Sequence, residues 1–395
     1  MSINVSVVGL GNCCSSLYQG ISYYRIHDEK KTGLMSEVIG GYTFKDIEFV
    51  AGFDVDERKV GKCFRDALFE KPNCTLTFVE KELMPEGPIV MKSPVLDGVA
   101  SVMANYSPAE AFRVDDKQLE MTRDEIIRVL KETKTDIIVN YLPVGSQKAT
   151  EFWAEICLET GISFLNCIPV FIASNPAWEQ RFVDAGIPLI GDDMRSQFGA
   201  SVLSQMLQEL AFARGHSVKC HIQRNIGGNT DFLNMTDKTR LTSKKISKEN
   251  VIAAQNRIRD IPIEVNSLHA GPSEYIAYFK DNKVANFHLE LEGFMGSPVV
   301  LDAQLSVIDS PNSAGVVIDA IRYLKVAREM GLRGAIRGPS AFTQKTPPEQ
   351  MMFADTCFEC TELSERRLTE RTAFQTQHYN VADAIASKPS FNTQL

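Results

Sequence analysis

Three lysines lie within five positions of an otherwise acidic chain. Residues 242–250 read TSKKISKEN, although the 395-residue chain has a formal net charge of −8. In a helix, Lys244 and Lys248 share one face with Cβ atoms about 5–6 Å apart, and Lys245 points about 100° away, into solvent. Two ammonium groups this close repel each other unless an anion lies between them. The run therefore indicates an anion-binding site, with a solvated helix end as the alternative.

A second polar cluster lies just before these lysines. Residues 225–232, NIGGNTDF, carry Asn225, Asn229 and Asp231 around two glycines. Such a run presents several polar groups to a ligand, or it forms an ordinary turn.

Two adjacent aspartates follow an apolar run. Residues 191–201, GDDMRSQFGAS, place Asp192 and Asp193 at the end of an expected strand and immediately before an expected helix. Ligands of open α/β sheets bind at that edge of the sheet. Capping of the helix N-terminus by an aspartate is the alternative.

An incomplete dinucleotide fingerprint stands at the first strand–helix junction. Gly9-Leu10-Gly11 lets the backbone turn tightly and lets a pyrophosphate approach the helix, but Cys14 stands where the third glycine is usual. Asp54 closes the second strand, where an acid binds ribose hydroxyls and favours NAD over NADP. The long spacing requires residues 20–46 to be looped out. Glycines in a turn without a ligand are the alternative.

Composition excludes several classes of protein. The acidic balance argues against a nucleic-acid binder, because no basic excess is available to release counterions. No apolar run approaches the roughly 18 residues that cross a bilayer, so no membrane is expected. The nine cysteines are scattered, and the C-x-x-C of Cys357 and Cys360 has no second pair for zinc. A cytoplasmic protein is expected.

The elements that position these residues fall into two patterns. Apolar runs such as 3–8 and 136–142 alternate with helical periodicity to about residue 200, which predicts a parallel sheet covered on both faces. Residues 275–308 alternate polar and apolar positions between turns, which predicts antiparallel strands. A helix ending at Gly331 follows.

Taken together, the motifs resemble one family, myo-inositol-phosphate synthase (inositol-3-phosphate synthase), in its compact bacterial-type form. The resemblance spans about residues 3–350. It is carried in order by VGLGNCCSSLYQG, AGFDVDERKVG, YLPVGS, PVFIASNPAW, GDDMRSQFGA, GGNTDFLNM, SKKISK, GPSEY, DSPNSAG and PSAFTQKTPPEQ. Ten ordered motifs are far more specific than any one of them. Arg195 departs from the family, where lysine is common, and Glu274 where aspartate is frequent.

The resemblance implies a set of site residues. The implied catalytic residues are Lys244, Lys248, Lys283, Lys345, Asp231 and Asp309. The implied substrate contacts are Asn225, Asn229, Lys248 and Lys283. The implied cofactor contacts are Gly9, Gly11, Asn12, Asp54, Asp193 and Ser196.

The implied reaction converts D-glucose 6-phosphate to 1D-myo-inositol 3-phosphate with bound NAD, a step of inositol and phospholipid biosynthesis. C5 is oxidised, a proton leaves C6, C6 attacks the C1 aldehyde, and C5 is reduced again. Fixed cations stabilise the developing oxyanions, and mutual repulsion lowers the proton affinity of clustered lysines. We expect Lys248 and Lys283 to hold phosphate, Lys244 and Lys345 to serve the C5 and C1 oxygens, and Asp231 and Asp309 to orient lysines.

The resemblance also implies the architecture. A Rossmann-type doubly wound parallel sheet, residues 1–200, is followed by an inserted α+β domain with an antiparallel sheet, 201–308. Residues 309–395 return to the first domain and end in a peripheral tail. The family sheet builds a homotetramer, and some members use a divalent metal, ammonium or another monovalent cation. Two alternatives stay open: an NAD-linked sugar-phosphate dehydrogenase, and a non-catalytic NAD-binding scaffold.

Overall fold

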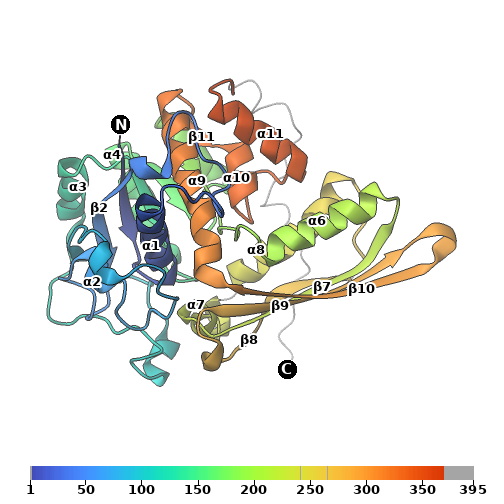
Figure 1. The fold of residues 1–395 in the computed structure, drawn as a ribbon, viewed down its shortest axis with the longest axis horizontal. Helices are drawn as coiled ribbons and strands as arrows, with labels where there is room; N and C mark the ends of the chain where they lie inside the picture. The colour runs from blue at the N-terminus through green and yellow to red at the C-terminus, as the bar shows by residue number, and fades with distance from the viewer. Residues whose placement is uncertain (1, 241, 265, 369–395) are drawn as a thin grey trace.

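Two β-sheets organise the protein in a computed structural model that describes residues 2–240, 242–264 and 266–368 (Figure 1). The larger sheet has seven strands in the order β11-β6-β5-β4-β1-β2-β3, and every neighbouring pair is parallel. Its strands are β1 (Ile3–Val8), β2 (Ile47–Asp54), β3 (Val90–Lys92), β4 (Ile137–Asn140), β5 (Ser163–Asn166), β6 (Pro188–Ile190) and β11 (Gly334–Ala335).

Helices cover both faces of this sheet, as its apolar central strands require. One core contains buried residues of α1 (Asn12–Ile26) and α9 (Asp309–Glu329). The other contains buried residues of α3 (Arg123–Glu132), α4 (Gln147–Thr160) and α5 (Pro176–Asp184). The predicted doubly wound sheet is confirmed, and its order changes direction between β1 and β4, where such folds bind ligands.

The second sheet has four strands in the order β10-β9-β7-β8. They are β7 (Ser217–Gly227), β8 (Leu268–Tyr275), β9 (Asn282–Glu292) and β10 (Pro298–Ile308). Strand β9 pairs antiparallel with β10, as predicted for 275–308, and also with β7, whereas β7 and β8 are parallel. The expected antiparallel sheet is therefore mixed, because the link from β7 to β8 contains the long helix α8 (Thr242–Ile258) and returns the chain in the same direction.

Helices α6 (Ala200–Ala213) and α8 lie on one face of the second sheet (Figure 1). A helix was expected directly after Asp193, but α6 begins later, with Gly199 at its N-cap position. Helix α1 also differs from expectation, because it continues to Ile26 and packs Leu17 and Ile21 into the core, so the looped segment is shorter than 20–46.

After β10 the chain returns to the first sheet, where α9 packs against α1. Helices α10 (Arg337–Thr343) and α11 (Phe353–Ser364) follow on the side of α9. The three-part division at 200 and 308 stays a prediction, and the expected tail lies largely outside the described residues. Within the described ranges, no helix is both long and apolar enough to span a bilayer.

Candidate functional site

One cavity receives side chains from both sheets and from the segment after α10. Every site residue proposed from the sequence lines it: Gly9, Gly11, Asn12, Asp54, Asp193, Ser196, Asn225, Asn229, Asp231, Lys244, Lys248, Lys283, Asp309 and Lys345. Residues that were not identified from the sequence also line the cavity, among them Lys59 and Gln223.

The glycine turn after β1 forms one end of the cavity. Gly9 has a φ of 88°, and a Cβ atom there would lie 2.7 Å from the Tyr141 carbonyl oxygen, so only glycine fits without strain. Gly11 is the N-cap of α1, and a Cβ atom there would meet nothing within 4 Å. The first turn of α1 therefore opens onto free space, as a helix N-terminus that receives a phosphate must.

Asp54 fixes this turn from the end of β2. Its carboxylate accepts hydrogen bonds from the backbone N–H groups of Leu10 (2.7 Å), Val55 (2.7 Å) and Asp56 (2.9 Å). Asn12 is also engaged, because its side-chain oxygen accepts from the Cys74 N–H at 2.7 Å. The free space before α1 and the acid beside it fit a dinucleotide with a ribose hydroxyl at Asp54.

The two consecutive aspartates after β6, Asp192 and Asp193, have different partners. Asp192 is fully buried and accepts from the N–H groups of Ile172 (3.0 Å) and Ser174 (3.0 Å) and from the Ser174 hydroxyl (2.8 Å). Asp192 thus holds a loop, and burial raises its pKa to about 6. Asp193 faces the cavity instead. Neither caps α6.

Asp193 is the centre of the lysine cluster. Its Oδ1 atom lies 3.1 Å from Lys244 Nζ and 3.0 Å from Lys345 Nζ, and its Oδ2 atom accepts from Ser247 at 2.6 Å. Burial alone would raise the pKa of Asp193, but the ammonium groups of Lys244 and Lys345 hold it well below its usual value. Its carboxylate oxygens bind these lysines and Ser247, and the expected contact of Asp193 with the cofactor stays a prediction.

The remaining acids pair with lysines as expected. Lys283 Nζ lies 2.8 Å from Asp309 Oδ1, and Lys244 Nζ lies 3.8 Å from Asp231 Oδ2. Lys244 and Lys248 project from the same face of α8 and are both buried. Within the described part of the chain, Lys248 makes no hydrogen bond or ion pair that would compensate its burial.

The protonation states of the buried lysines diverge. Burial would lower the pKa of Lys244, but Asp193 and Asp231 raise it above its ordinary value. Burial and the charges of Lys244, Lys283 and Lys345 hold the pKa of Lys248 well below 10.5. Burial also lowers the pKa of Lys345 to about 8, against the attraction of Asp193. Two lysines on one face of α8 are therefore shifted in opposite directions, Lys244 toward its charged form and Lys248 toward its neutral form.

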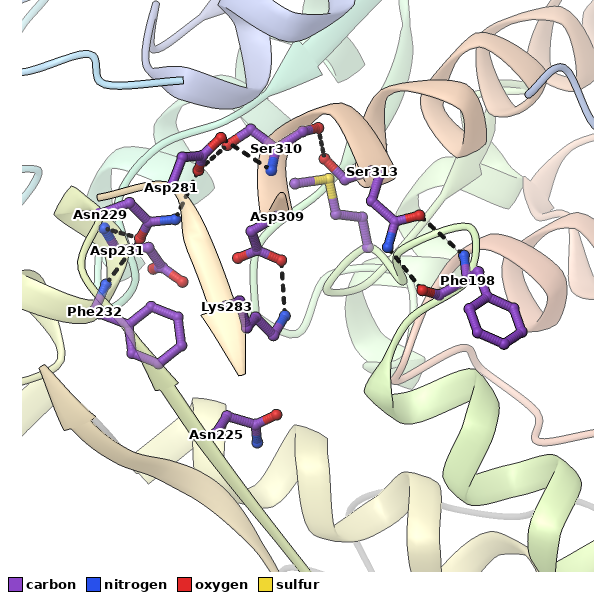
Figure 2. Close-up of polar contacts among 12 residues, drawn as sticks. Phe198, Asn225, Asn229, Asp231, Phe232, Asp281, Lys283, Asp309, Ser310 and Ser313 are labelled. Atoms are coloured by element: carbon purple, nitrogen blue, oxygen red, sulfur yellow. Dashed lines mark hydrogen bonds and ion pairs between the residues drawn. The ribbon is translucent and has the colours of Figure 1, made fainter. Parts of the chain in front are cut away.

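Another carboxylate near the lysine cluster, Asp281, was not identified from the sequence. Figure 2 shows Asp281 accepting from the Asn229 amide (3.1 Å) and the Ser310 hydroxyl (2.7 Å), beside the Lys283–Asp309 pair. The side-chain oxygen of Asn229 caps α7 (Thr230–Asn234) by accepting from the backbone N–H of Asp231 (3.1 Å). Both ends of the Asn229 amide are therefore fixed by the protein.

Arg195, the departure from the family pattern, does not line the cavity. It is buried, and its Nε atom donates to the Gln344 carbonyl at 2.6 Å, so it holds the segment before Lys345. Among the described side chains, no group of three or more His, Cys, Asp and Glu residues is placed to hold a metal ion.

The chain is similar to known proteins along most of its length. Residues 199–310 match the family described as myo-inositol-1-phosphate synthase. The inositol-3-phosphate synthase of Mycolicibacterium smegmatis is 41% identical over 353 residues, which make up 88% of this chain and 94% of that protein. The inositol-3-phosphate synthase of Corynebacterium glutamicum is 42% identical over 358 residues, 89% of this chain and 94% of that protein.

Solved structures are similar as well. The crystal structure of Ari2 has a TM-score of 0.72 and 32% identity, and the match covers 93% of this chain and 99% of Ari2. Inositol-3-phosphate synthase of Caenorhabditis elegans has a TM-score of 0.67 and covers 95% of this chain and 89% of its own. At 16% identity, that second likeness shows the fold alone.

Proposed function

The chain belongs to the inositol-3-phosphate synthase family, and from this premise we infer that it converts glucose 6-phosphate to inositol 3-phosphate with NAD as its cofactor. The observation that carries the inference is the convergence of four lysines from α8, β9 and the segment after α10 on the cavity that the glycine turn also lines. A sugar phosphate is an anion of the size and charge that such a cluster accepts.

NAD, when bound, supplies the hydride acceptor for sugar oxidation and the hydride donor for the later reduction. We propose that the residues around the glycine turn hold it: Gly9, Gly11, Asn12, Asp54 and Ser196. The open space at Gly11 and the acid at the end of β2 support this assignment.

The substrate phosphate is assigned to Lys248 and Lys283. Lys283 is held in place by Asp309 at 2.8 Å, and Lys248 lies in the same cavity. An arriving phosphate dianion raises the pKa of Lys248 again, because an opposite charge favours the charged form. Substrate binding thereby favours the charged form of Lys248, which binds phosphate.

The reacting oxygens are assigned to Lys244 and Lys345. Both donate to Asp193, which fixes the two ammonium groups relative to each other before substrate arrives. Preorganised cations stabilise charge that develops on C5 and C1 oxygens without reorganisation. With a pKa of about 8, Lys345 can give and take a proton near neutral pH.

Incubation with glucose 6-phosphate and NAD tests the proposal. The expected product is inositol phosphate without net NADH, because the cofactor is returned to its starting state in each cycle. Steady NADH accumulation would instead support a sugar-phosphate dehydrogenase, and no turnover would support a non-catalytic scaffold. Parallel reactions with EDTA and with added ammonium test whether a cation assists.

We also propose that the protein is a cytoplasmic homotetramer assembled through the second sheet. All nine cysteines are free, as in a reducing compartment. Strand β10 is a long edge strand, and Phe294 and Met295 beside it are 83% and 87% exposed. Exposed edges and apolar tips of this kind are typical of surfaces that pair with another subunit.

A further inference from the structure

A line of buried polar side chains runs from the core of the second sheet into the cavity. His221, Gln223 and Asn225 alternate along β7 and so point to the same face, toward α6. Ser204 and Gln208 come from α6 at positions four residues apart, which share a helix face. All five are at most 4% exposed, although apolar side chains at these places would pack at lower cost.

Hydrogen bonds join these side chains into one chain. Gln208 Nε2 lies 2.9 Å from His221 Nδ1, and His221 Nε2 lies 3.0 Å from Ser204 Oγ. Ser204 donates to Gln223 Oε1 at 2.9 Å, and Gln223 Nε2 donates to Asn225 Oδ1 at 3.1 Å. Asn225 Nδ2 ends the chain by donating to the Gly271 carbonyl at 2.9 Å.

The Gly271 carbonyl fixes the direction of the bonds as far as His221 Nε2, because a carbonyl oxygen only accepts. Asn225 must turn its nitrogen to Gly271 and its oxygen to Gln223, and Gln223 must then turn its oxygen to Ser204. The Ser204 proton is used in that bond, so His221 must donate from Nε2. At the other ring nitrogen, Gln208 Nε2 can only donate, so Nδ1 accepts and the ring is neutral, which agrees with a pKa that burial lowers to about 4.

Both amides at the end of the chain line the cavity. Each NH₂ group has two protons, and the bonds above use one of each. The second N–H of Gln223 and of Asn225 is left for a ligand, and Figure 2 shows Asn225 beneath the Lys283–Asp309 pair. A sugar phosphate offers hydroxyl and phosphoryl oxygens, which accept such donors.

We propose that His221 is a positioning residue that acts through Ser204 to hold the Gln223 and Asn225 amides with their N–H groups toward the oxygens of the sugar phosphate. Gln223 is thereby a substrate contact in addition to those implied by the family. The inference rests on the proposed function for the identity of the substrate. The donor and acceptor order of the hydrogen bonds does not depend on that function.

Ser204→Ala and His221→Leu test the proposal in the full-length protein. Ser204→Ala removes the donor to Gln223 Oε1, and His221→Leu removes the donor that keeps the Ser204 hydroxyl turned to Gln223. In each variant the Gln223 amide is held mainly by its bond to Asn225, so it turns away from the substrate more readily. We expect kcat/KM for glucose 6-phosphate to fall about tenfold, the effect of one hydrogen bond of about 1.4 kcal/mol. The fall should be mostly in KM, since the contact is present in the bound substrate as well as in the transition state. The Kd of NAD should not change.

Two variants separate positioning from a merely structural role. His221→Gln keeps a side-chain N–H near the Nε2 position and should recover most of the loss. His216→Leu removes a half-buried histidine beside the other end of β7 and should leave kcat/KM unchanged. Wild-type kcat/KM in Ser204→Ala, or a lower melting temperature as the only change in both donor-deleting variants, would overturn the proposal.

Nitrogen-15 NMR of His221 makes the test independent of turnover. The expected spectrum is that of a neutral ring protonated at Nε2 from pH 6 to 8, and a ring protonated at Nδ1 would overturn the proposal. A wild-type protein that forms no inositol phosphate yet shows the expected tautomer would contradict the proposed function and leave the direction of the chain standing.

Discussion

The pKa values of two lysines in the cluster are shifted in opposite directions although both side chains line one cavity. Asp193 keeps Lys244 charged, whereas burial and three neighbouring ammonium groups hold the pKa of Lys248 well below its ordinary value. A buried amine without a hydrogen-bond partner costs free energy that the rest of the fold must supply. The same property makes the pKa of Lys248 responsive, because a phosphate that enters the cavity raises it again.

Replacing Lys248 by methionine separates these two consequences. We expect Lys248→Met to lose inositol phosphate formation, because the proposed phosphate contact is gone, and to keep NAD binding, because the glycine turn is untouched. The ligand-free variant should gain about 1 kcal/mol in free energy of unfolding near neutral pH, since an apolar side chain of similar length fills the site. Kinetic assays and urea unfolding measure the two effects.

The stability gain of Lys248→Met should depend on pH. The pKa of Lys248 is lower in the folded protein than its ordinary 10.5. Between those values the unfolded chain binds a proton that the folded one has released, so this lysine makes wild-type stability rise with pH. The difference between variant and wild type should therefore shrink as the pH rises toward 10. A constant difference would contradict the lowered pKa.

Lys245→Met is the matched control on the same helix. Its side chain is 55% exposed, and its Nζ atom lies 3.8 Å from Glu249 Oε1 on the outer side of α8. The substitution should leave turnover unchanged and give no comparable, pH-dependent gain in stability. Equal loss of turnover in both variants would mean that α8 itself, rather than Lys248, had been disturbed.

The lysines could be predicted from the sequence, but the ion pairs that Asp193 makes with Lys244 and Lys345 could not. The pattern of 242–250 predicted that Lys244 and Lys248 share a face, which α8 confirms. Asp193 bonds to Lys244 across 51 residues and to Lys345 across 152, and no local pattern carries that proximity. The roles of all these residues in the reaction stay predictions.

At the scale of elements, the turn between β1 and α1 depends on two glycines for different reasons. Gly9 is required by the fold, because a side chain there would strike the Tyr141 carbonyl and its φ of 88° disfavours any other residue. Gly11 has neither constraint, so the fold would accept a side chain there, and the proposed reason for a glycine is the space that a pyrophosphate needs in front of α1.

Alanine at each position should therefore act differently. Gly9→Ala should lower the melting temperature, because a backbone carbonyl at 2.7 Å cannot move away cheaply. Gly11→Ala should keep wild-type stability and weaken NAD binding, because its methyl group occupies the proposed cofactor space. Thermal unfolding and NAD titration by calorimetry measure both. Wild-type NAD affinity in Gly11→Ala would move the cofactor away from this turn.

Elements were predictable where period and burial agree, and not where pairing depends on distant segments. The apolar runs of the first sheet and the alternating polar and apolar residues of 275–308 correctly predicted strands. The parallel pairing of β7 with β8 follows from the position of α8 between them, which no strand pattern reveals. The alternation of His221, Gln223 and Asn225 was visible in the sequence, but only α6 gives the three side chains their partners.

At the scale of the whole molecule, the second sheet extends away from the first, with α6 and α8 on one of its faces (Figure 1). Leu301 and Leu305 of β10 turn toward α6, so by alternation Val300 and Asp302 turn to the opposite face. Val300 is 57% exposed in the single chain. This open face and the unpaired edge of β10 are the surfaces that the proposed tetramer would cover.

Val300→Lys tests that assembly without disturbing the chain itself. Val300 stands opposite Glu290 on β9, so a lysine gains a cross-strand partner within its own chain. In an interface the same ammonium group would be buried at high cost. We expect light scattering after size exclusion to give a tetramer for wild type and a smaller species for the variant, with little change in circular dichroism. Leu119→Lys, at a side chain 93% exposed on the first part of the chain, should leave the mass unchanged. A wild-type monomer, or a tetramer that persists in Val300→Lys, would show that this face is not the one by which the subunits associate.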